Sequence, residues 1–309
     1  MRRALVPLSL AAVALLWGVA FVAIKQGLRE VSPWSLAVLR FAIAALLLAG
    51  VMAIWPKTRP RIPRDAWGRI VVLGFTGVPA YHLALNWGEQ RTSASVAALI
   101  VATAPVMVAL ASPLALGERV NARGVVGIAL AFAGVGILAA QSRDGTATQV
   151  AGFAVTILAP AAWAVYTIIA KPLTARIPSI QITIASMLVG TVMLLPLVGP
   201  ALIRDARALS LPGWGWTLWL GAGGSAAGYI LFNYALTHLS ATKVAVSIYF
   251  VPVIALIAAW AVIDEPLGPR VGVAAVLVLA GVALTQRGGV RARAPLPPAE
   301  EPVAIPSES

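Results

Sequence analysis

The chain is built from long apolar stretches that are separated by short polar connections. The apolar residues within each stretch follow one another without regular alternation, which favours helices over the strands of a membrane barrel. Each stretch is close to the roughly 20 residues that a helix needs to cross a bilayer. We therefore predict an all-α integral membrane protein with ten transmembrane helices, at residues 5–25, 33–54, 68–89, 93–116, 121–140, 149–171, 179–199, 213–236, 241–263 and 268–286.

One apolar phrase occurs twice along the chain. Residues 105–118 read PVMVALASPLALGE and residues 252–265 read PVIALIAAWAVIDE, each with proline first and glutamate last. The match is longer than this phrase and keeps one offset of 147 residues, which joins Trp67 to Trp214, Gly74 to Gly221, Asn86 to Asn233, Pro105 to Pro252, Glu118 to Glu265 and Gly134 to Gly281. Nearer the beginning, Trp17 matches Trp163 and Lys25 matches Lys171 at an offset of 146. The chain therefore contains two copies of one unit.

The repeat divides the chain into two units of five predicted helices, residues 1–140 and residues 149–286. Because five is an odd number, the two units must cross the membrane in opposite orientations. Inverted repeats around a central cavity are the architecture of transporters that work by alternating access. Residues 287–309 are rich in proline and polar residues, and we expect a disordered cytoplasmic tail there.

Composition supports a membrane protein. Hydrophobic residues make up 60% of the chain and charged residues only 11%, whereas soluble domains hold about 25% charged residues. The chain has no cysteine, which excludes disulfides and thiolate metal sites. His82 and His238 are too far apart in sequence for a typical zinc motif, and we expect no metal and no cofactor.

The basic residues set the expected orientation. The net charge is +12, but the charges lie in the connections, so we expect no nucleic-acid partner. On the side of the N-terminus lie Arg2, Arg3, Lys57, Arg59, Arg61, Arg64, Arg69, Arg119, Arg123, Lys171, Arg176, Lys243, Arg287, Arg291 and Arg293. The opposite side holds only Lys25, Arg29, Arg91, Arg143, Arg204, Arg207 and Arg270. This bias predicts a multi-pass protein of the bacterial inner membrane with both termini in the cytoplasm.

The first apolar stretch also has the features of a cleavable secretory signal. Trp17 and Lys25 nevertheless have counterparts in residues 149–171, so we expect the stretch to be kept as the first helix.

The sequence resembles the EamA-type ten-helix permeases of the drug/metabolite transporter superfamily. The resemblance covers nearly the whole chain before the tail, and it rests on LLWGVAFVAIK (15–25), PWSLAVLR (33–40), NWGEQRTSAS (86–95), APVMVALASPLALGE (104–118), NYALTHLSATKVAV (233–246) and VPVIALIAAWAVIDEP (251–266). It implies a bundle of two inverted five-helix repeats around a central cavity, and export of small metabolites such as amino acids.

The sequence departs from the superfamily in its acidic residues. Four-helix multidrug relatives carry a glutamate in the middle of the first helix for proton and cation binding. Residues 5–25 contain no acid, and no Asp or Glu lies deep in any predicted span. Proton-coupled efflux of cations by that mechanism is therefore not expected. Glu118 and Glu265 lie at helix ends, where we interpret them as interfacial caps.

Arg40 is the main candidate for substrate binding. It lies about seven residues into the second predicted helix, where a charged side chain is costly and marks a functional site by default. A substrate carboxylate could pair with both arms of its guanidinium. In the alternative, the side chain extends along its stem to the interface.

The remaining candidates are polar or aromatic residues at membrane depth. Asn86 and Asn233 either hold helices together or contact substrate. Trp17 and Trp163 either wall the cavity or face lipid and neighbouring helices. The other members of a polar lining are Tyr81, His82, Tyr166, Tyr229 and Tyr249. Pro105 and Pro252 are predicted in mid-helix as kinks that shape the cavity or flex during gating.

We interpret the protein as a secondary transporter and not as an enzyme. No P-loop motif is present, so ATP does not drive transport directly. The absence of buried acids and the presence of Arg40 favour amino acids or related zwitterionic or anionic substrates, moved by a monomer in the lipid bilayer. A multidrug, nucleotide-sugar or lipid carrier of the same fold is the alternative. A membrane-embedded enzyme would need clustered catalytic groups that the predicted spans lack.

Overall fold

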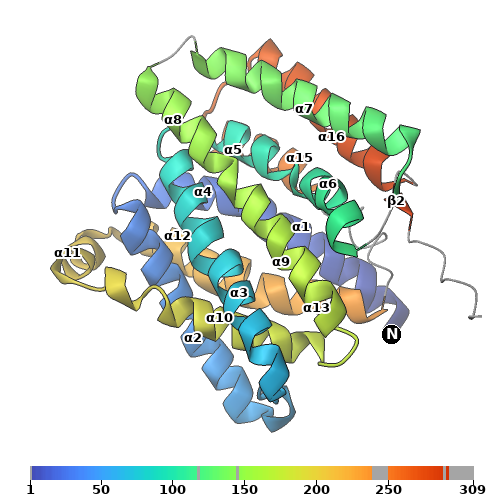
Figure 1. Ribbon diagram of the computed structural model, residues 1–309. Helices are drawn as coiled ribbons and strands as arrows, with labels where there is room; N and C mark the ends of the chain where they lie inside the picture. Colours follow the sequence, from blue (N-terminus) through green and yellow to red (C-terminus); the bar gives the residue numbers. More distant parts are fainter. Residues whose placement is uncertain (1, 117–118, 144–145, 239–249, 288–289, 292–309) are drawn as a thin grey trace, which may run out of the picture.

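The computed structural model describes residues 2–116, 119–143, 146–238, 250–287 and 290–291. Within these residues the chain is helical almost throughout (Figure 1). The only strands in these ranges are β1 (Arg119–Val120) and β2 (Val290–Arg291), which pair antiparallel. The prediction of an all-helical chain is therefore confirmed, with this two-residue pairing as its one addition.

The helices of the first half follow the predicted stretches. They are α1 (Arg2–Gly27), α2 (Pro33–Ile54), α3 (Trp67–Phe75), α4 (Tyr81–Glu89), α5 (Ala94–Val101), α6 (Ala104–Leu116) and α7 (Ala122–Arg143). Short 3₁₀ turns occupy Pro56–Thr58 and Arg64–Ala66. A π-helical segment, η3 (Thr76–Ala80), joins α3 to α4 without a break.

The described part of the second half is also helical. Its helices are α8 (Ala147–Thr156), α9 (Leu158–Leu173), α10 (Ser179–Val192), α11 (Pro200–Ala208), α12 (Leu211–Leu218), α13 (Gly228–His238), α15 (Phe250–Ile263) and α16 (Pro269–Gln286). A 3₁₀ turn lies at Leu195–Leu197, and a second π-helical segment, η5 (Trp219–Ala227), joins α12 to α13.

In the part of the chain that the structure describes, seven helical stretches are long and apolar enough to cross a membrane. They begin at Val6 and end at Leu197, and two shorter apolar helices follow, Phe250–Ile263 and Pro269–Thr285. The predicted stretch at residues 213–236 lies within one continuous helical run, Leu211 to His238. Part of the stretch at residues 241–263 lies outside the described residues, and the total of ten spans stays a prediction.

Several predicted spans contain short breaks, as at residues 149–171, where α8 ends at Thr156 and α9 begins at Leu158. The stretch at residues 93–116 contains two helices, because α5 ends at Val101 and α6 begins at Ala104. Pro105 has no backbone N–H and therefore suits the first turn of a helix. The prediction that Pro105 lies in mid-helix is wrong, since it lies at the start of α6. Pro252 lies in α15 close to residues 239–249, which are outside the described residues, so its mid-helix position stays a prediction.

The sequence pattern did not predict α11, which is short and has no buried residue. Its Asp205 carboxylate accepts a hydrogen bond from the backbone N–H of Ser32, 3.2 Å away, and Ser32 in turn caps α2. Burial raises the pKa of Asp205, but hydrogen bonds from Ser35 and Ser32 outweigh it and leave the pKa below its ordinary value. The contact fixes α11 against the beginning of α2.

The outer surface is as apolar as a lipid environment requires. Large hydrophobic side chains remain exposed on many helices, among them Leu46 on α2, Leu211 on α12 and Val276 on α16. A soluble monomer rarely exposes a contiguous apolar surface of this extent, whereas lipid solvates such side chains at no cost. The exposed surface and the seven long apolar helices support a multi-pass membrane protein.

Helices α7 and α16, which are far apart in sequence, lie side by side (Figure 1). Glycine brings their backbones together: a Cβ on Gly281 would lie 2.5 Å from the carbonyl oxygen of Gly127 and 2.5 Å from the backbone nitrogen of Ala131. A Cβ on Gly134 would similarly lie 2.9 Å from the carbonyl oxygen of Ala274. The pair is therefore packed backbone against backbone, as small residues permit in membranes.

Candidate functional site

A cavity of about 130 Å³ lies inside the bundle. Helices from both halves of the chain line it: α1, α2, α4, α5 and α6 from the first, and α9, α13, α15 and α16 from the second. Pro105 and Pro252, the matching prolines of the two repeats, are both in its wall. The central cavity that the sequence predicts is therefore present between the two halves.

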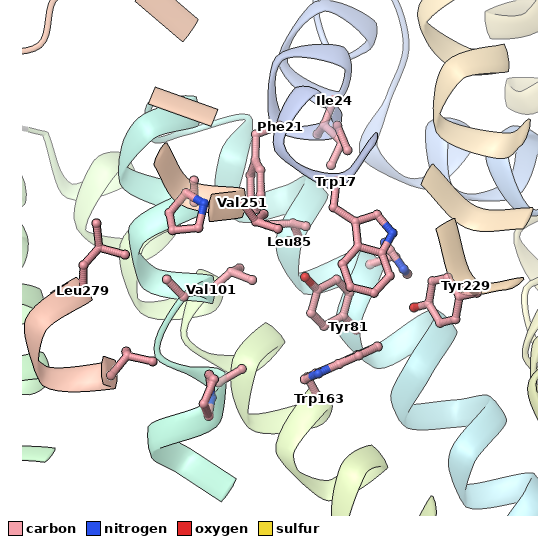
Figure 2. Close-up of a pocket in the computed structure, with 18 of the residues that line it drawn as sticks. Trp17, Phe21, Ile24, Tyr81, Leu85, Val101, Trp163, Tyr229, Val251 and Leu279 are labelled. Atoms are coloured by element: carbon pink, nitrogen blue, oxygen red, sulfur yellow. The ribbon is translucent and has the colours of Figure 1, made fainter. Parts of the chain in front are cut away.

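Four aromatic residues gather on one side of this cavity, and aliphatic residues such as Val101 and Leu279 lie on the other (Figure 2). The ring centroids of Trp17 and Trp163 are 6.2 Å apart, and Tyr229 lies 5.7 Å from Trp17 and 5.9 Å from Trp163. Tyr81 lies 5.7 Å from Trp163. Edge-to-face contacts of this kind hold rings in fixed positions, so the cavity has a rigid aromatic wall.

Arg40 is the cationic residue of this wall. Its side chain is 3% exposed, so it does not extend to the membrane interface. Nε donates to the Ser225 hydroxyl at 2.7 Å, and Nη1 lies 3.2 Å from Nδ1 of His82. Because a guanidinium can only donate, Nδ1 must accept, which places the proton of His82 on Nε2. Nη2 has no hydrogen-bond partner among the described residues.

Two predicted site residues do not line the cavity. Asn86 is fully buried, and its amide donates to the carbonyl of Pro33 at 3.1 Å, which links α4 to the start of α2. Tyr166 stacks on Trp163, with centroids 5.1 Å apart, and lines a second, smaller hollow beside Thr183 and Ser186. The side chain of Asn233 and the whole of Tyr249 lie outside the part of the chain that the structure describes.

The prediction that no acid is buried is wrong. Glu89, the last residue of α4, is 0% exposed, and neither carboxylate oxygen has a hydrogen-bond partner among the described residues. Lys25 lies beside it, and its ammonium donates to the carbonyl of Glu89 at 2.8 Å and to the carbonyl of Thr92. The sequence pattern missed Glu89 because it lies where a predicted span ends, and this position normally indicates an exposed interfacial residue.

Glu265 caps a helix, as predicted, but the helix is not its own. Its carboxylate oxygens accept from the backbone N–H groups of Ala94 and Ser95, at 2.9 Å and 3.0 Å, at the start of α5. Asp264 adopts a left-handed backbone conformation, with φ 52°, and the N–H of Glu265 bonds to the carbonyl of Ala259. This ending of α15 turns Glu265 back toward α5, so the second half of the chain is joined to the first.

The cavity is therefore apolar and aromatic, with one fixed cation. Arg40 suits a carboxylate, the rings suit an apolar or cationic group, and the aliphatic wall suits a side chain without charge. No group of three or more metal-ligating side chains occurs in the described ranges.

Comparisons with known proteins agree with this architecture. The profile of the EamA-like transporter family matches residues 5–140 and again residues 150–287. The chain is 34% identical over 271 residues to a "Probable terminal-alkyne amino-acid exporter" from Streptantibioticus cattleyicolor, covering 88% of this chain and 90% of that protein. It is 28% identical over 287 residues to a "Probable amino-acid metabolite efflux pump" from Escherichia coli, covering 87% and 91%.

A solved crystal structure is similar in fold. It aligns with a TM-score of 0.63 over 90% of this chain and 95% of that chain, at 20% sequence identity. At this identity the likeness concerns the fold alone.

Proposed function

The chain belongs to the EamA-like transporter family, and on this premise we propose that it is a secondary transporter that exports amino acids or related zwitterionic or anionic compounds by alternating access. The observation that carries the proposal is the cavity, where a buried guanidinium stands next to four aromatic rings between the two halves of the chain. The printed names of the two relatives, an amino-acid exporter and an amino-acid metabolite efflux pump, support this substrate class.

The cavity wall supports this substrate class. An amino-acid carboxylate would take the free arm of the Arg40 guanidinium, a charge-assisted hydrogen bond that is strong in a dry site. The ammonium group would lie over the faces of Trp17 and Trp163. An apolar side chain would face Val101 and Leu279.

Reciprocal packing supports the two inverted repeats that alternating access needs. Gly134 faces Ala274 and Val278, and Gly281 faces Gly127 and Ala131. Each of these positions lies 147 residues from its counterpart in the other half. A two-fold axis produces this relation, in which residue i contacts j while the mate of i contacts the mate of j.

A second pair of contacts between helices is related by the same two-fold symmetry. Gly74 faces Ser186 and Gly190 on α10, and its mate Gly221 faces Arg40 and Ile43 on α2. If each unit crosses the membrane five times, the axis lies in the membrane plane, and exchanging the shapes of the two halves turns an inward-open state into an outward-open one.

Counterflow in liposomes tests the proposal. We expect vesicles that contain the protein and unlabelled leucine to accumulate external radiolabelled leucine or phenylalanine without ATP, and protein-free vesicles to accumulate none. A panel of cationic dyes and nucleotide sugars should give no counterflow. Counterflow of the dyes alone would overturn the amino-acid assignment, and its absence for every compound would overturn the transporter proposal.

The proposed orientation places both termini in the cytoplasm. Because the chain has no cysteine, a single introduced cysteine can be labelled without background. We expect Thr148→Cys, in the exposed first turn of α8, to react with a membrane-impermeant maleimide in intact cells, and Lys57→Cys to react only after the cells are opened. The reverse pattern would invert the topology, and equal labelling of both in intact cells would contradict an odd number of crossings between them.

A further inference from the structure

We propose that Glu89 is a proton-binding site and that its proton is the coupling ion of transport, an inference that rests on the proposed function. The carboxyl group is fully buried, and neither oxygen has a hydrogen-bond partner among the described residues. An ionised carboxylate in this position would lose its hydration and gain no compensating bond, which costs several kcal/mol. The side chain is therefore stable here as the neutral acid, with one proton bound.

Glu89 lies just beyond one end of the cavity. Leu85, one helical turn before it on α4, lines the cavity, and so does Ile24, the neighbour of Lys25 on α1 (Figure 2). The Lys25 ammonium holds the end of α1 against the α4–α5 connection through the carbonyls of Glu89 and Thr92. Glu89 is 0% exposed at this end of the cavity, so the acid reaches water only when the end opens.

Among the residues that the structure describes, few charged groups act on this carboxyl. They are Lys25 on α1, Arg40 on α2 and Glu265 beyond the end of α15. Helices α5 and α8 also pack near α4 and contain no titratable residue. On α9, Tyr166 packs on Gly77, about three helical turns from Glu89, and Lys171 lies farther along that helix.

Protonation of Glu89 is linked to the opening and closing of this end of the cavity. When the Lys25 end opens, water reaches the acid, and the proton passes from the carboxyl oxygen to that water and leaves an ionised carboxylate. The carboxylate resists burial until it binds a proton again, so protonation favours closure of this end. In an exporter, one proton would enter as one substrate molecule leaves.

Infrared spectroscopy of the whole protein in lipid tests the site without any substrate. At pH values above about 6, where exposed carboxylic acids are ionised, we expect a carbonyl band of a protonated carboxylic acid that disappears as the pH is raised further. Over the same pH range this band should be missing from Glu89→Gln. Glu30→Gln, which removes an exposed carboxylate, should keep the band. A band that survives in Glu89→Gln, or a Glu89 band that stays unchanged at alkaline pH, would overturn the proton site.

Flux measurements with radiolabelled leucine test the coupling. With the membrane potential clamped at zero, a 1:1 exchange of proton for substrate limits the concentration ratio to about tenfold per pH unit of gradient. We expect the wild type and Glu89→Asp to approach that ratio, and Glu89→Gln to show a ratio near one while it retains counterflow. Equal gradient-driven accumulation by wild type and Glu89→Gln would overturn the coupling role. If the wild type shows no leucine counterflow, the proposed function is contradicted. The infrared measurement needs no substrate, so it would still decide whether Glu89 is a proton site.

Discussion

We expect Arg40→Gln to raise the KM for an amino-acid substrate about 10- to 100-fold, which corresponds to the roughly 1.5–3 kcal/mol of a hydrogen bond to a charged group. The cause is the loss of the fixed cation that would pair with the substrate carboxylate. Glutamine retains a polar group near Ser225 and His82, which hold the guanidinium in the native protein. Initial rates of leucine counterflow at several concentrations measure the change.

A substrate without a carboxylate provides the control for this prediction. The wild type should transport the methyl ester of leucine with a KM raised by a similar factor, and Arg40→Gln should no longer distinguish leucine from its ester. Ser225→Ala removes only a partner of Nε, so its effect should be smaller and should preserve the distinction. A full preference for the free acid in Arg40→Gln would show that Arg40 does not bind the carboxylate.

Replacing Gly281 with alanine destabilises the protein by about 1–3 kcal/mol, the usual cost of overpacking a close contact. The added Cβ would lie 2.5 Å from backbone atoms of Gly127 and Ala131, and backbone atoms cannot move aside as a flexible side chain can. Helices α7 and α16 must therefore separate. The decrease in stability is measured by heating the purified protein in detergent and monitoring the loss of its monodisperse form.

Gly272 is the matched control for Gly281 because it lies on the same helix. A Cβ at Gly272 meets nothing within 4 Å, and alanine has the higher helix propensity. Gly272→Ala should therefore leave the unfolding temperature unchanged or raise it slightly. An equal decrease in both variants would show that the close contact between α7 and α16 does not determine the result.

The sequence predicts most of the fold because lipid permits little besides uninterrupted apolar helices. The bounds of α2 at residues 33–54 are the predicted ones, since Ser32 caps the helix and Pro33 occupies its first position. The pattern does not predict the break between α5 and α6, because hydropathy is equally high on both sides of it. It also misses α11, whose residues are too polar and too few to register as a span.

The site is predictable in part. The repeat pairs Trp17 with Trp163, and the structure brings these residues together because they lie close to the interface between the two halves. Asn86 is also polar and lies within a predicted span, but its amide is already bonded to Pro33. Sequence alone cannot separate these cases, because a cavity residue and a helix-contact residue differ only in the direction of the side chain. Glu89 shows the same limit, because a shift of one helical turn is enough to move a residue from the membrane interface to the protein interior.

The two π-helical segments, η3 and η5, occupy matching places in the two halves. In a π turn the N–H of one residue bonds five positions back, as Gly228 does to the carbonyl of Gly223, so each turn holds one more residue than an α turn. Conversion of either segment to α geometry would release that residue and rotate the helix that follows it. Tyr81 directly follows η3, and Tyr229 follows η5 by one residue. The conversion would therefore rotate these two tyrosines of the aromatic wall about their helix axes while both helices remain hydrogen-bonded along their length.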